Sequence, residues 1–201
     1  MIHAVISDLG KVVLWFDNDI FIRKLAASSP VPADRIKEAA GWNRDLLVAF
    51  DKGLLSPAEF HRRVAAAVGS DIARDEFFAI YNDIFTPNPP ALDALRGEKA
   101  AGRTLILLSN TDVERFGFVR RRFPEVLFFD DYVLSYEVGM VKPEPGIYLE
   151  AARRAGSAPD ECVFIDDLPE NVAAAEEAGM AGIVYTAGVD LAAVLEKLTS
   201  R

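Results

Sequence analysis

HAVISDLGKVVLWFD, residues 3–17, carries a short apolar run into a single carboxylate, Asp8, and then into a glycine, Gly10. Residues 3–7 have the length and the apolar character of a buried strand. An acidic side chain at the end of such a strand either begins a turn or belongs to a site at the edge of a sheet. The rest of the chain decides between these two interpretations.

Four further apolar runs predict strands, and helical patterns alternate with them. We expect the strands at 104–109, 131–135, 162–165 and 182–185, and the helices near 112–122, 145–156, 169–178 and 188–198. The stretch Thr111-Asp112-Val113-Glu114 has the pattern of a capping box that opens the first of these helices. Such an alternation is typical of an α/β fold with a parallel sheet.

A long interval without a predicted strand separates the first strand from the second. Helical patterns lie near 18–28, 33–41, 43–52, 56–68 and 74–85, and Ser56-Pro57-Ala58-Glu59 is typical of a helix start. A crossover of this length exceeds what a sheet requires. We therefore expect a core domain of residues 1–14 and 88–201 and a helical cap of residues 15–87, with the proline-rich stretch 85–92 returning the chain to the core.

Composition limits the possible partners and locations. The chain has 201 residues, a formal net charge of −9 and one cysteine, Cys162. The negative charge disfavours nucleic-acid binding, and no apolar run approaches the ~18 residues of a membrane-spanning helix. A lone cysteine can form no intrachain disulfide, and the first residues lack the pattern of a signal peptide, so we expect a cytoplasmic protein. A monomer and a homodimer are both compatible with the sequence.

Polar residues follow the predicted strands where these strands end. They are Asp8, Ser109, Asn110, Lys142, Asp166 and Asp167. Each one alone has an ordinary explanation as a turn residue, a helix cap or a surface lysine. In a parallel sheet, however, the carboxyl ends of the strands share one edge. Two carboxylates brought together there repel each other unless a cation lies between them, and hard oxygen ligands favour Mg²⁺.

Four ordered motifs resemble those of the haloacid dehalogenase (HAD) superfamily. They are DLGKVV at 8–13, LLSNT at 107–111, GMVKPEPGIY at 139–148 and FIDDLPENV at 164–172. The helical insertion after the first motif is similar to the C1-type cap of that superfamily. The resemblance implies a Rossmannoid α/β core with a parallel sheet and a small all-helical cap. Within the superfamily, the motifs are most similar to those of the bacterial α-D-glucose-1-phosphate phosphatases.

The resemblance also implies a phosphatase mechanism. Asp8 would be the nucleophile that forms an aspartyl-phosphate, and Lys142 would balance the charge next to it. Ser109 and the backbone N–H of Asn110 would bind the transferring phosphoryl group together with Lys142. The substrate would be a small phosphorylated metabolite, with a hexose 1-phosphate as the preferred candidate.

A magnesium site follows from the same resemblance. The ion would be held by the side chain of Asp8, the carbonyl of Gly10 and the side chain of Asp167. Asp166 would contribute directly or through a water molecule. The cation would neutralise the oxygens that crowd together when two anions meet.

One expected carboxylate is missing. Most phosphatases of the superfamily carry a second Asp two positions after the nucleophile as a general acid and base, and this chain has Gly10 there. Such a group is typically worth ~10²–10⁴ in rate. The substrate could have a good leaving group, Asp17, His61 or a water could stand in, or the chain could be a weakly active phosphosugar-binding or regulatory protein. A metal-independent 2-haloacid dehalogenase is a further alternative, which the acidic pair Asp166-Asp167 disfavours.

The cap is expected to select the substrate, because it covers this edge of the sheet. The candidates to line the cavity are Trp15, Phe16, Trp42, Asn43, Arg44 and Phe50. The aromatic ones could instead form the core of the cap, and Arg44 could instead pair with Asp45 or Glu38 on the surface. Lys11 is expected to point to solvent. Asn171 either supports the metal site or lies on an exposed helix face.

Overall fold

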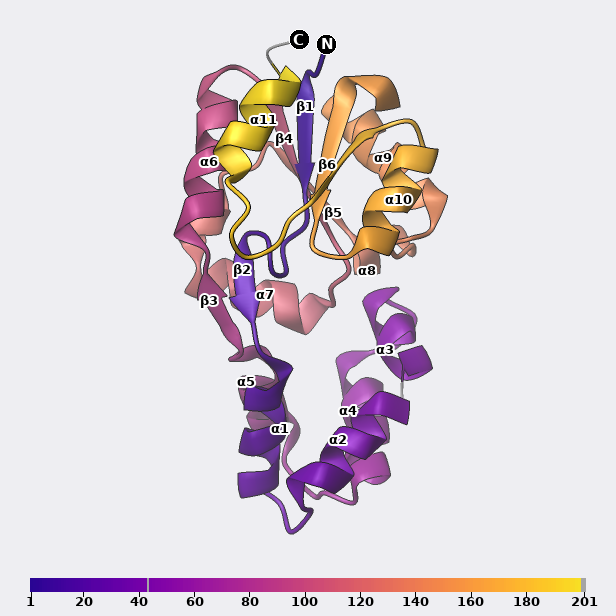
Figure 1. Ribbon diagram of the computed structural model, residues 1–201. Coiled ribbons are helices and arrows are strands. Elements are labelled where there is room, and N and C mark those ends of the chain that lie inside the picture. Colours follow the sequence, from indigo (N-terminus) through magenta and orange to yellow (C-terminus); the bar gives the residue numbers. More distant parts are fainter. Residues whose placement is uncertain (43, 200–201) are drawn as a thin grey trace.

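A five-stranded parallel sheet forms the centre of the molecule (Figure 1). The computed structural model describes residues 1–42 and 44–199. Its strands follow the order β5-β4-β1-β6-β7. They comprise β1 (Ala4–Ser7), β4 (Thr104–Ser109), β5 (Asp131–Leu134), β6 (Cys162–Asp166) and β7 (Ala181–Val184). The predicted α/β class is thus confirmed, as is each predicted strand of the sheet to within one residue at either end.

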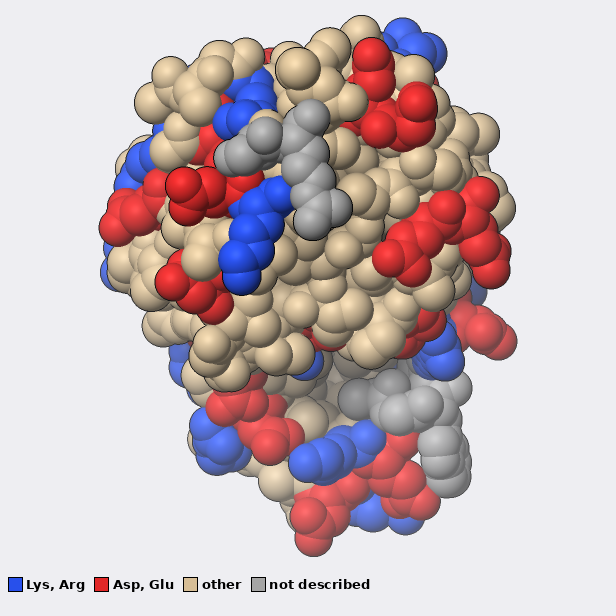
Figure 2. All heavy atoms as spheres, turned by 45° about the horizontal axis from the view of Figure 1, so that its top comes forward, with Lys and Arg blue, Asp and Glu red and all other residues tan. Residues whose placement is uncertain are grey.

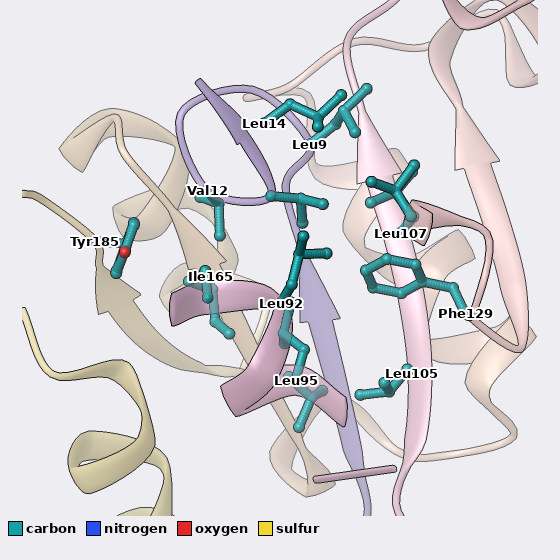
Figure 3. Close-up of a cluster of buried hydrophobic side chains, with 14 of the residues drawn as sticks. Leu9, Val12, Leu14, Leu92, Leu95, Leu105, Leu107, Phe129, Ile165 and Tyr185 are labelled. Atoms are coloured by element: carbon teal, nitrogen blue, oxygen red, sulfur yellow. The ribbon is translucent and has the colours of Figure 1, made fainter. Parts of the chain in front are cut away.

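Helices cover both faces of the sheet because its strands are apolar on both sides. Val5, Leu105 and Leu107 point to one face, where α6 (Pro89–Ala100), α7 (Val113–Arg122) and α11 (Leu191–Thr199) cover them. Ala4 and Ile6 point to the other face, against α9 (Pro145–Ala155) and α10 (Pro169–Glu177). Figure 3 shows the first of these clusters, in which Leu92 and Leu95 of α6 meet Leu105 and Leu107 of β4.

An inserted segment leaves the core after β1 and returns before α6. It begins and ends with two short antiparallel strands, β2 (Leu14–Phe16) and β3 (Phe85–Pro87). Between them lie α1 (Asn18–Ala27), α2 (Ala33–Trp42), α3 (Arg44–Asp51), α4 (Pro57–Val68) and α5 (Arg74–Asn82). These helices share an apolar cluster of their own, in which the rings of Phe50 and Phe60 stack with centroids 4.1 Å apart.

Two expectations from the sequence are wrong in this region and beside it. Residues 15–87 do contain strand, because β2 and β3 pair with each other, but three residues are too few to show a periodicity. The stretch 85–92 does return the chain to the core, and α6 begins within it at Pro89. The N-cap of α7 is Asp112 rather than Thr111, because the Asp112 carboxylate accepts the N–H groups of Glu114 and Arg115.

The inserted helices touch the core at two places. The Tyr81 hydroxyl of α5 donates a hydrogen bond of 3.1 Å to the Asp112 carboxylate before α7. Lys52, after α3, forms an ion pair with Glu144 in the loop that follows α8 (Ser135–Val138). Short 3₁₀ turns at Pro124–Val126 and Pro159–Glu161 complete the core.

The surface carries charges of both signs. Figure 2 shows acidic and basic side chains interspersed over the core and the inserted helices on one face. No helix of the described part of the chain is long and apolar enough to cross a membrane.

Replacement of Leu107 by Ala tests the core described above. Its side chain is fully buried between the sheet and α6, so the substitution should lower the free energy of unfolding by about 2–5 kcal/mol in urea denaturation. Leu149→Ala is the matched control, because Leu149 on α9 is 49% exposed and its loss should cost less than about 1 kcal/mol. Equal losses in the two variants would contradict this packing.

Candidate active site

The polar residues predicted from the strand ends do meet at one edge of the sheet. Asp8 directly follows β1, which lies between β4 and β6. Ser109 is the last residue of β4 and Asp166 the last of β6. Asp8 and Ser109 line a cavity of ≈ 180 Å³ together with neighbouring loops, and Asp166 does not line it. The predicted residues that line it are Asp8, Gly10, Ser109, Asn110, Lys142 and Asp167.

Lys142 bridges two carboxylates at the base of this cavity. Its Nζ lies 2.7 Å from Asp8 Oδ1 and 2.6 Å from Asp166 Oδ2, and its side chain is only 2% exposed. The side chain of Asn110 fixes the backbone at this point: Lys142 N donates to Asn110 Oδ1 at 2.7 Å, and Asn110 Nδ2 donates to Lys142 O at 3.0 Å. The lysine is therefore held from both its backbone and its ammonium group.

Asp166 lies fully buried behind Asp8 and Lys142. Its Oδ1 accepts the backbone N–H of Leu168 at 2.8 Å, and Asn171 Nδ2 donates to both carboxylate oxygens at 3.1 Å. Asn171 is thus a buried partner of Asp166. Both oxygens of Asp166 thus accept hydrogen bonds, and Oδ2 anchors the ammonium group of Lys142.

Asp8 keeps one oxygen free of protein donors. Oδ1 accepts hydrogen bonds from Lys142 Nζ and from the backbone N–H of Leu9, the latter at 2.7 Å. No residue in the ranges 1–42 and 44–199 donates to Oδ2. The remaining oxygen is therefore available to a metal ion or to an electrophile.

Burial raises the pKa of Asp8 to about 7, against the opposing effect of Lys142 and with a further increase from Asp166. Lys142 does not prevent this rise in pKa, because its single ammonium group faces two buried carboxylates and cannot fully compensate both. Burial acts to lower the pKa of Lys142, but Asp8 and Asp166 outweigh it and the pKa is raised, so this ammonium stays charged.

The donor set fits a hard divalent cation. Asp8, Asp166 and Asp167 each offer one carboxylate oxygen, and these atoms all lie within 4.8 Å of one another. Lys11 is partly exposed, as expected, with 45% of its side chain accessible, but its Nζ also lies 3.3 Å from Asp167 Oδ2 and the residue lines the cavity. Its backbone is left-handed, with φ at 55°, which turns the chain sharply after Gly10. Three carboxylates thus face two ammonium groups, those of Lys11 and Lys142, and the remaining negative charge suits a divalent cation.

Gly10 is a glycine because Phe16 occupies the space beside it. A Cβ atom at position 10 would lie 2.8 Å from Phe16 Cε1, closer than carbon atoms approach. The ring of Phe16 also lines the cavity. The absence of a carboxylate at this position is therefore built into the packing of β2 against the loop after β1.

Neither of the side chains considered as a replacement for this carboxylate lines the cavity. Asp17 caps α1 through Asp19 N and lies 3.5 Å from Arg23. His61 Nε2 contacts the carbonyl of Ile72 at 2.9 Å, within the inserted helices. Both are accounted for by local structure.

Of the aromatic residues proposed to line the cavity, only Phe16 does so among those described. Phe50 belongs to the apolar cluster of the inserted helices, and Trp15 stacks on Tyr185. Arg44 is exposed, and the side chain of Trp42 and the whole of Asn43 lie outside the described residues. Phe85 and Arg115 line the cavity and were missed. Arg115 lies four residues after Thr111, the last residue of the LLSNT motif. Its side chain faces the cavity because α7 begins at Val113.

Comparison with known proteins gives a consistent set of matches. The model of the haloacid dehalogenase-like hydrolase family matches residues 11–179. A sesquiterpene phosphatase, astK of Aspergillus oryzae, is 26% identical over 91% of this chain and 89% of its own length. The D-ribitol-5-phosphate phosphatase of Bacteroides thetaiotaomicron is 24% identical over 89% of each chain. The crystal structure of a HAD family enzyme from the same bacterium, in complex with magnesium and inorganic phosphate, superimposes with a TM-score of 0.85 at 28% identity, covering 96% of this chain and 99% of the other.

Substitution of Gly10 by Ala tests the contact with Phe16. The added methyl group should lower the free energy of unfolding by about 1–3 kcal/mol, because the ring must move. In a double-mutant cycle with Phe16→Leu, the smaller side chain should recover at least about half of this loss. Gly97→Ala is the control: no atom lies within 4 Å of a Cβ there, so that helical substitution should stabilise slightly. Additive effects at positions 10 and 16 would contradict the contact.

The raised pKa of Asp8 predicts that Mg²⁺ binding depends on pH. Since the folded pKa of about 7 lies above the ordinary value of 3.8, Asp8 is protonated in the metal-free site at pH 6, and binding must release that proton. Mg²⁺ affinity should rise about tenfold per pH unit below about pH 6.5 and level off above about pH 8. Calorimetric titrations in buffers of different ionisation enthalpy measure the proton release. An affinity that is constant from pH 5 to 8 would contradict it.

Proposed function

This chain belongs to the haloacid dehalogenase-like hydrolase family, and we propose that it is a Mg²⁺-dependent phosphatase that forms an aspartyl-phosphate on Asp8. The observation that carries the proposal is the free oxygen of Asp8 beside the buried ammonium group of Lys142. A carboxylate with one oxygen fixed and the other open is oriented for attack on phosphorus. Phosphatases among the relatives that match nearly the whole chain support the same reaction class.

Asp8 would form a bond to phosphorus while the ester oxygen departs on the opposite side. The alcohol leaves with a proton taken from water, and a second water molecule then attacks the phosphorus of the aspartyl-phosphate. That step releases inorganic phosphate and restores the carboxylate. Two displacements through a covalent intermediate replace one difficult displacement by water.

The phosphoryl oxygens would be bound by groups around the nucleophile. We assign this role to the hydroxyl of Ser109, the backbone N–H of Asn110 and the ammonium group of Lys142, all of which line the cavity. They supply donors fixed before the substrate arrives, which is the main source of transition-state stabilisation for phosphoryl transfer. The two hydrogen bonds between the Asn110 side chain and the Lys142 backbone fix the position of these two residues relative to each other.

Asp8, Asp167 and the carbonyl of Gly10 would hold Mg²⁺, with Asp166 behind them. The bound ion would neutralise the crowded phosphoryl and carboxylate oxygens. The proposal draws support from the carboxylate cluster and from the magnesium and phosphate in the related structure. Lys11, which pairs with Asp167, would have to release that oxygen when the ion binds.

We further propose that a core of residues 1–14 and 88–201 carries this chemistry and that residues 15–87 form a cap that selects the substrate. Among the described residues, the lining of the cavity holds no carboxylic acid other than Asp8 and Asp167, and its remaining ionisable side chains are those of Lys11, Arg115 and Lys142. A substrate whose leaving group departs without an acid suits such a site. We therefore propose a hexose 1-phosphate, because an anomeric hydroxyl is more acidic than a primary alcohol.

A metal-independent 2-haloacid dehalogenase is the main alternative within the family. It attacks carbon and has no use for a cluster of three carboxylates that a cation must compensate. Buried Asp166 and partly exposed Asp167 therefore favour phosphoryl transfer. The phosphatase relatives argue in the same direction.

Asp8→Asn tests the proposed nucleophile. With Mg²⁺ and 4-nitrophenyl phosphate or α-D-glucose 1-phosphate, the variant should lose at least about 10³-fold in kcat, because the amide is a far weaker nucleophile. Removal of Mg²⁺ with EDTA should abolish wild-type turnover, and added Mg²⁺ should restore it. Among natural phosphates, turnover should favour the anomeric ester over glucose 6-phosphate.

Asp17→Asn is the matched control, since Asp17 caps α1 and does not line the cavity. It should retain turnover. Turnover that survives in Asp8→Asn would contradict the nucleophile. Equal inertness of the wild type and Asp8→Asn, with phosphate still bound, would instead favour a phosphosugar-binding protein.

A further inference from the structure

Arg115 is a cation of the cavity that the proposed mechanism does not use. It lines the same cavity as Asp8 and Lys142 and lies in the first turn of α7. Among the described residues no carboxylate lies within ion-pair distance of its guanidinium group, and its buried Nε finds no hydrogen-bond partner. The single side-chain hydrogen bond it makes there, from Nη2 to the carbonyl of Tyr81, is long at 3.5 Å. A guanidinium group in this state has donors to offer to a ligand.

Two aromatic rings and the start of a helix hold this guanidinium group in place. Its Cζ lies 4.1 Å from the centroid of the Tyr81 ring and 5.8 Å from that of Phe85. Tyr81 is itself fixed by its hydrogen bond to Asp112, and the Asp112 carboxylate accepts the backbone N–H of Arg115 at 2.9 Å. An arginine stacked in this way loses little conformational freedom when it binds a ligand.

The position of Arg115 is on the side of the cavity where the leaving group would lie. The groups proposed to bind phosphate come from the ends of β1 and β4 and from the loop after α8. Phe16, Phe85 and Tyr81, by contrast, come from the inserted segment. In an in-line displacement the ester oxygen leaves on the side opposite the nucleophile, away from the sheet edge. Arg115 lies among these inserted residues and would face what is attached to that oxygen.

The charges around the cavity favour a neutral partner for Arg115. The ammonium groups of Lys142 and Lys11 face three carboxylates, those of Asp8, Asp166 and Asp167. A divalent cation would offset the two negative charges of a phosphomonoester. Burial acts to lower the pKa of Arg115, but Tyr81, Asp112 and Asp51 together outweigh it and raise the pKa, so the guanidinium group stays charged and already faces these acidic groups. No surplus positive charge remains for a second anion. Hydroxyl oxygens can accept its N–H groups without adding charge.

We infer that Arg115 is a specificity-determining residue that binds hydroxyl oxygens of a polyol or sugar leaving group. The inference rests on the proposed phosphatase function and narrows its substrate class. A planar guanidinium group presents parallel N–H donors that suit two adjacent oxygens, as on a sugar ring or an alditol chain. An apolar or aryl leaving group would gain nothing from these donors.

Arg115 also joins α7 to α5 through Tyr81, so the test must separate recognition from packing. The measured quantity is the ratio of kcat/KM for a hydroxylated substrate to kcat/KM for 4-nitrophenyl phosphate, with Mg²⁺ present. The hydroxylated substrate is α-D-glucose 1-phosphate or D-ribitol 5-phosphate, whichever the wild type hydrolyses faster. A packing role lowers both values together, whereas recognition lowers the ratio.

Arg115→Gln should lower this ratio by about 10–100-fold, the loss expected for one or two hydrogen bonds from a charged donor. Arg115→Lys keeps the charge but loses the planar fork, and its ratio should fall by an intermediate factor. Arg121→Gln is the control, because Arg121 is exposed on the same helix, and its ratio should equal that of the wild type. An unchanged ratio in both Arg115 variants would overturn the inference, as would a wild type that hydrolyses neither hydroxylated substrate.

A binding measurement separates this inference from the proposed function. In Mg²⁺-loaded Asp8→Asn, calorimetry with the same phosphates should show that adding Arg115→Gln weakens the hydroxylated ligand at least about tenfold more than the aryl one. If Asp8 governs turnover of the aryl phosphate but Arg115→Gln weakens both ligands equally, only the role of Arg115 fails. If Asp8→Asn leaves turnover intact while the binding difference persists, the nucleophile fails and Arg115 remains a determinant of ligand choice.

Discussion

The site depends on one buried contact, the ammonium group of Lys142 held between Asp8 and Asp166. Burying these three charges is costly, and it is tolerated only because each has several partners. Asp166 accepts hydrogen bonds from the Asn171 side chain and the Leu168 N–H. Asp8 accepts one from the Leu9 N–H, and the Asn110 side chain accepts the backbone N–H of Lys142. One ammonium group still cannot balance two carboxylates, and Asp167 adds a third. Lys11 pairs with Asp167, but three carboxylates still face only two ammonium groups, and we propose that a divalent cation with a phosphate ester compensates this deficit of positive charge.

The parallel sheet brings these groups together, and the inserted segment adds two aromatic rings to the cavity. β1 lies between β4 and β6, so three strand ends carry Asp8, Ser109 and Asp166 to one edge. β2 and β3 then place Phe16 and Phe85 against that edge. Phe16 fills the space in which a side chain at position 10 would stand. Phe16 and Phe85 thus bound the cavity on the side of the inserted segment, and Phe16 also occupies the space beside Gly10.

The sequence was most informative where apolar runs end in polar residues. A buried strand such as 104–109 is a continuous apolar stretch in the sequence. The polar residues at the ends of such strands are expected at one edge of the sheet, and the structure places them there. β2 and β3 have three residues each, too few to show an alternation of apolar and polar positions. The sequence pattern did not predict α6, whose first two residues are prolines. Lys11 and Arg115 are cationic side chains whose direction depends on a left-handed backbone turn and on where α7 begins, neither of which composition reveals. Tertiary contacts, and not local pattern, set these features.

The most direct test of the central claim is to locate the divalent cation. Mn²⁺ can replace Mg²⁺ among oxygen ligands, and its anomalous scattering identifies it in a crystal soaked with Mn²⁺ and inorganic phosphate. The account predicts a single strong anomalous peak within bonding distance of the Asp8 and Asp167 carboxylates and the Gly10 carbonyl, with the Lys142 ammonium still between Asp8 and Asp166. A saturated crystal with no peak there, or with Asp8 and Asp167 turned away from a common ion, would contradict it.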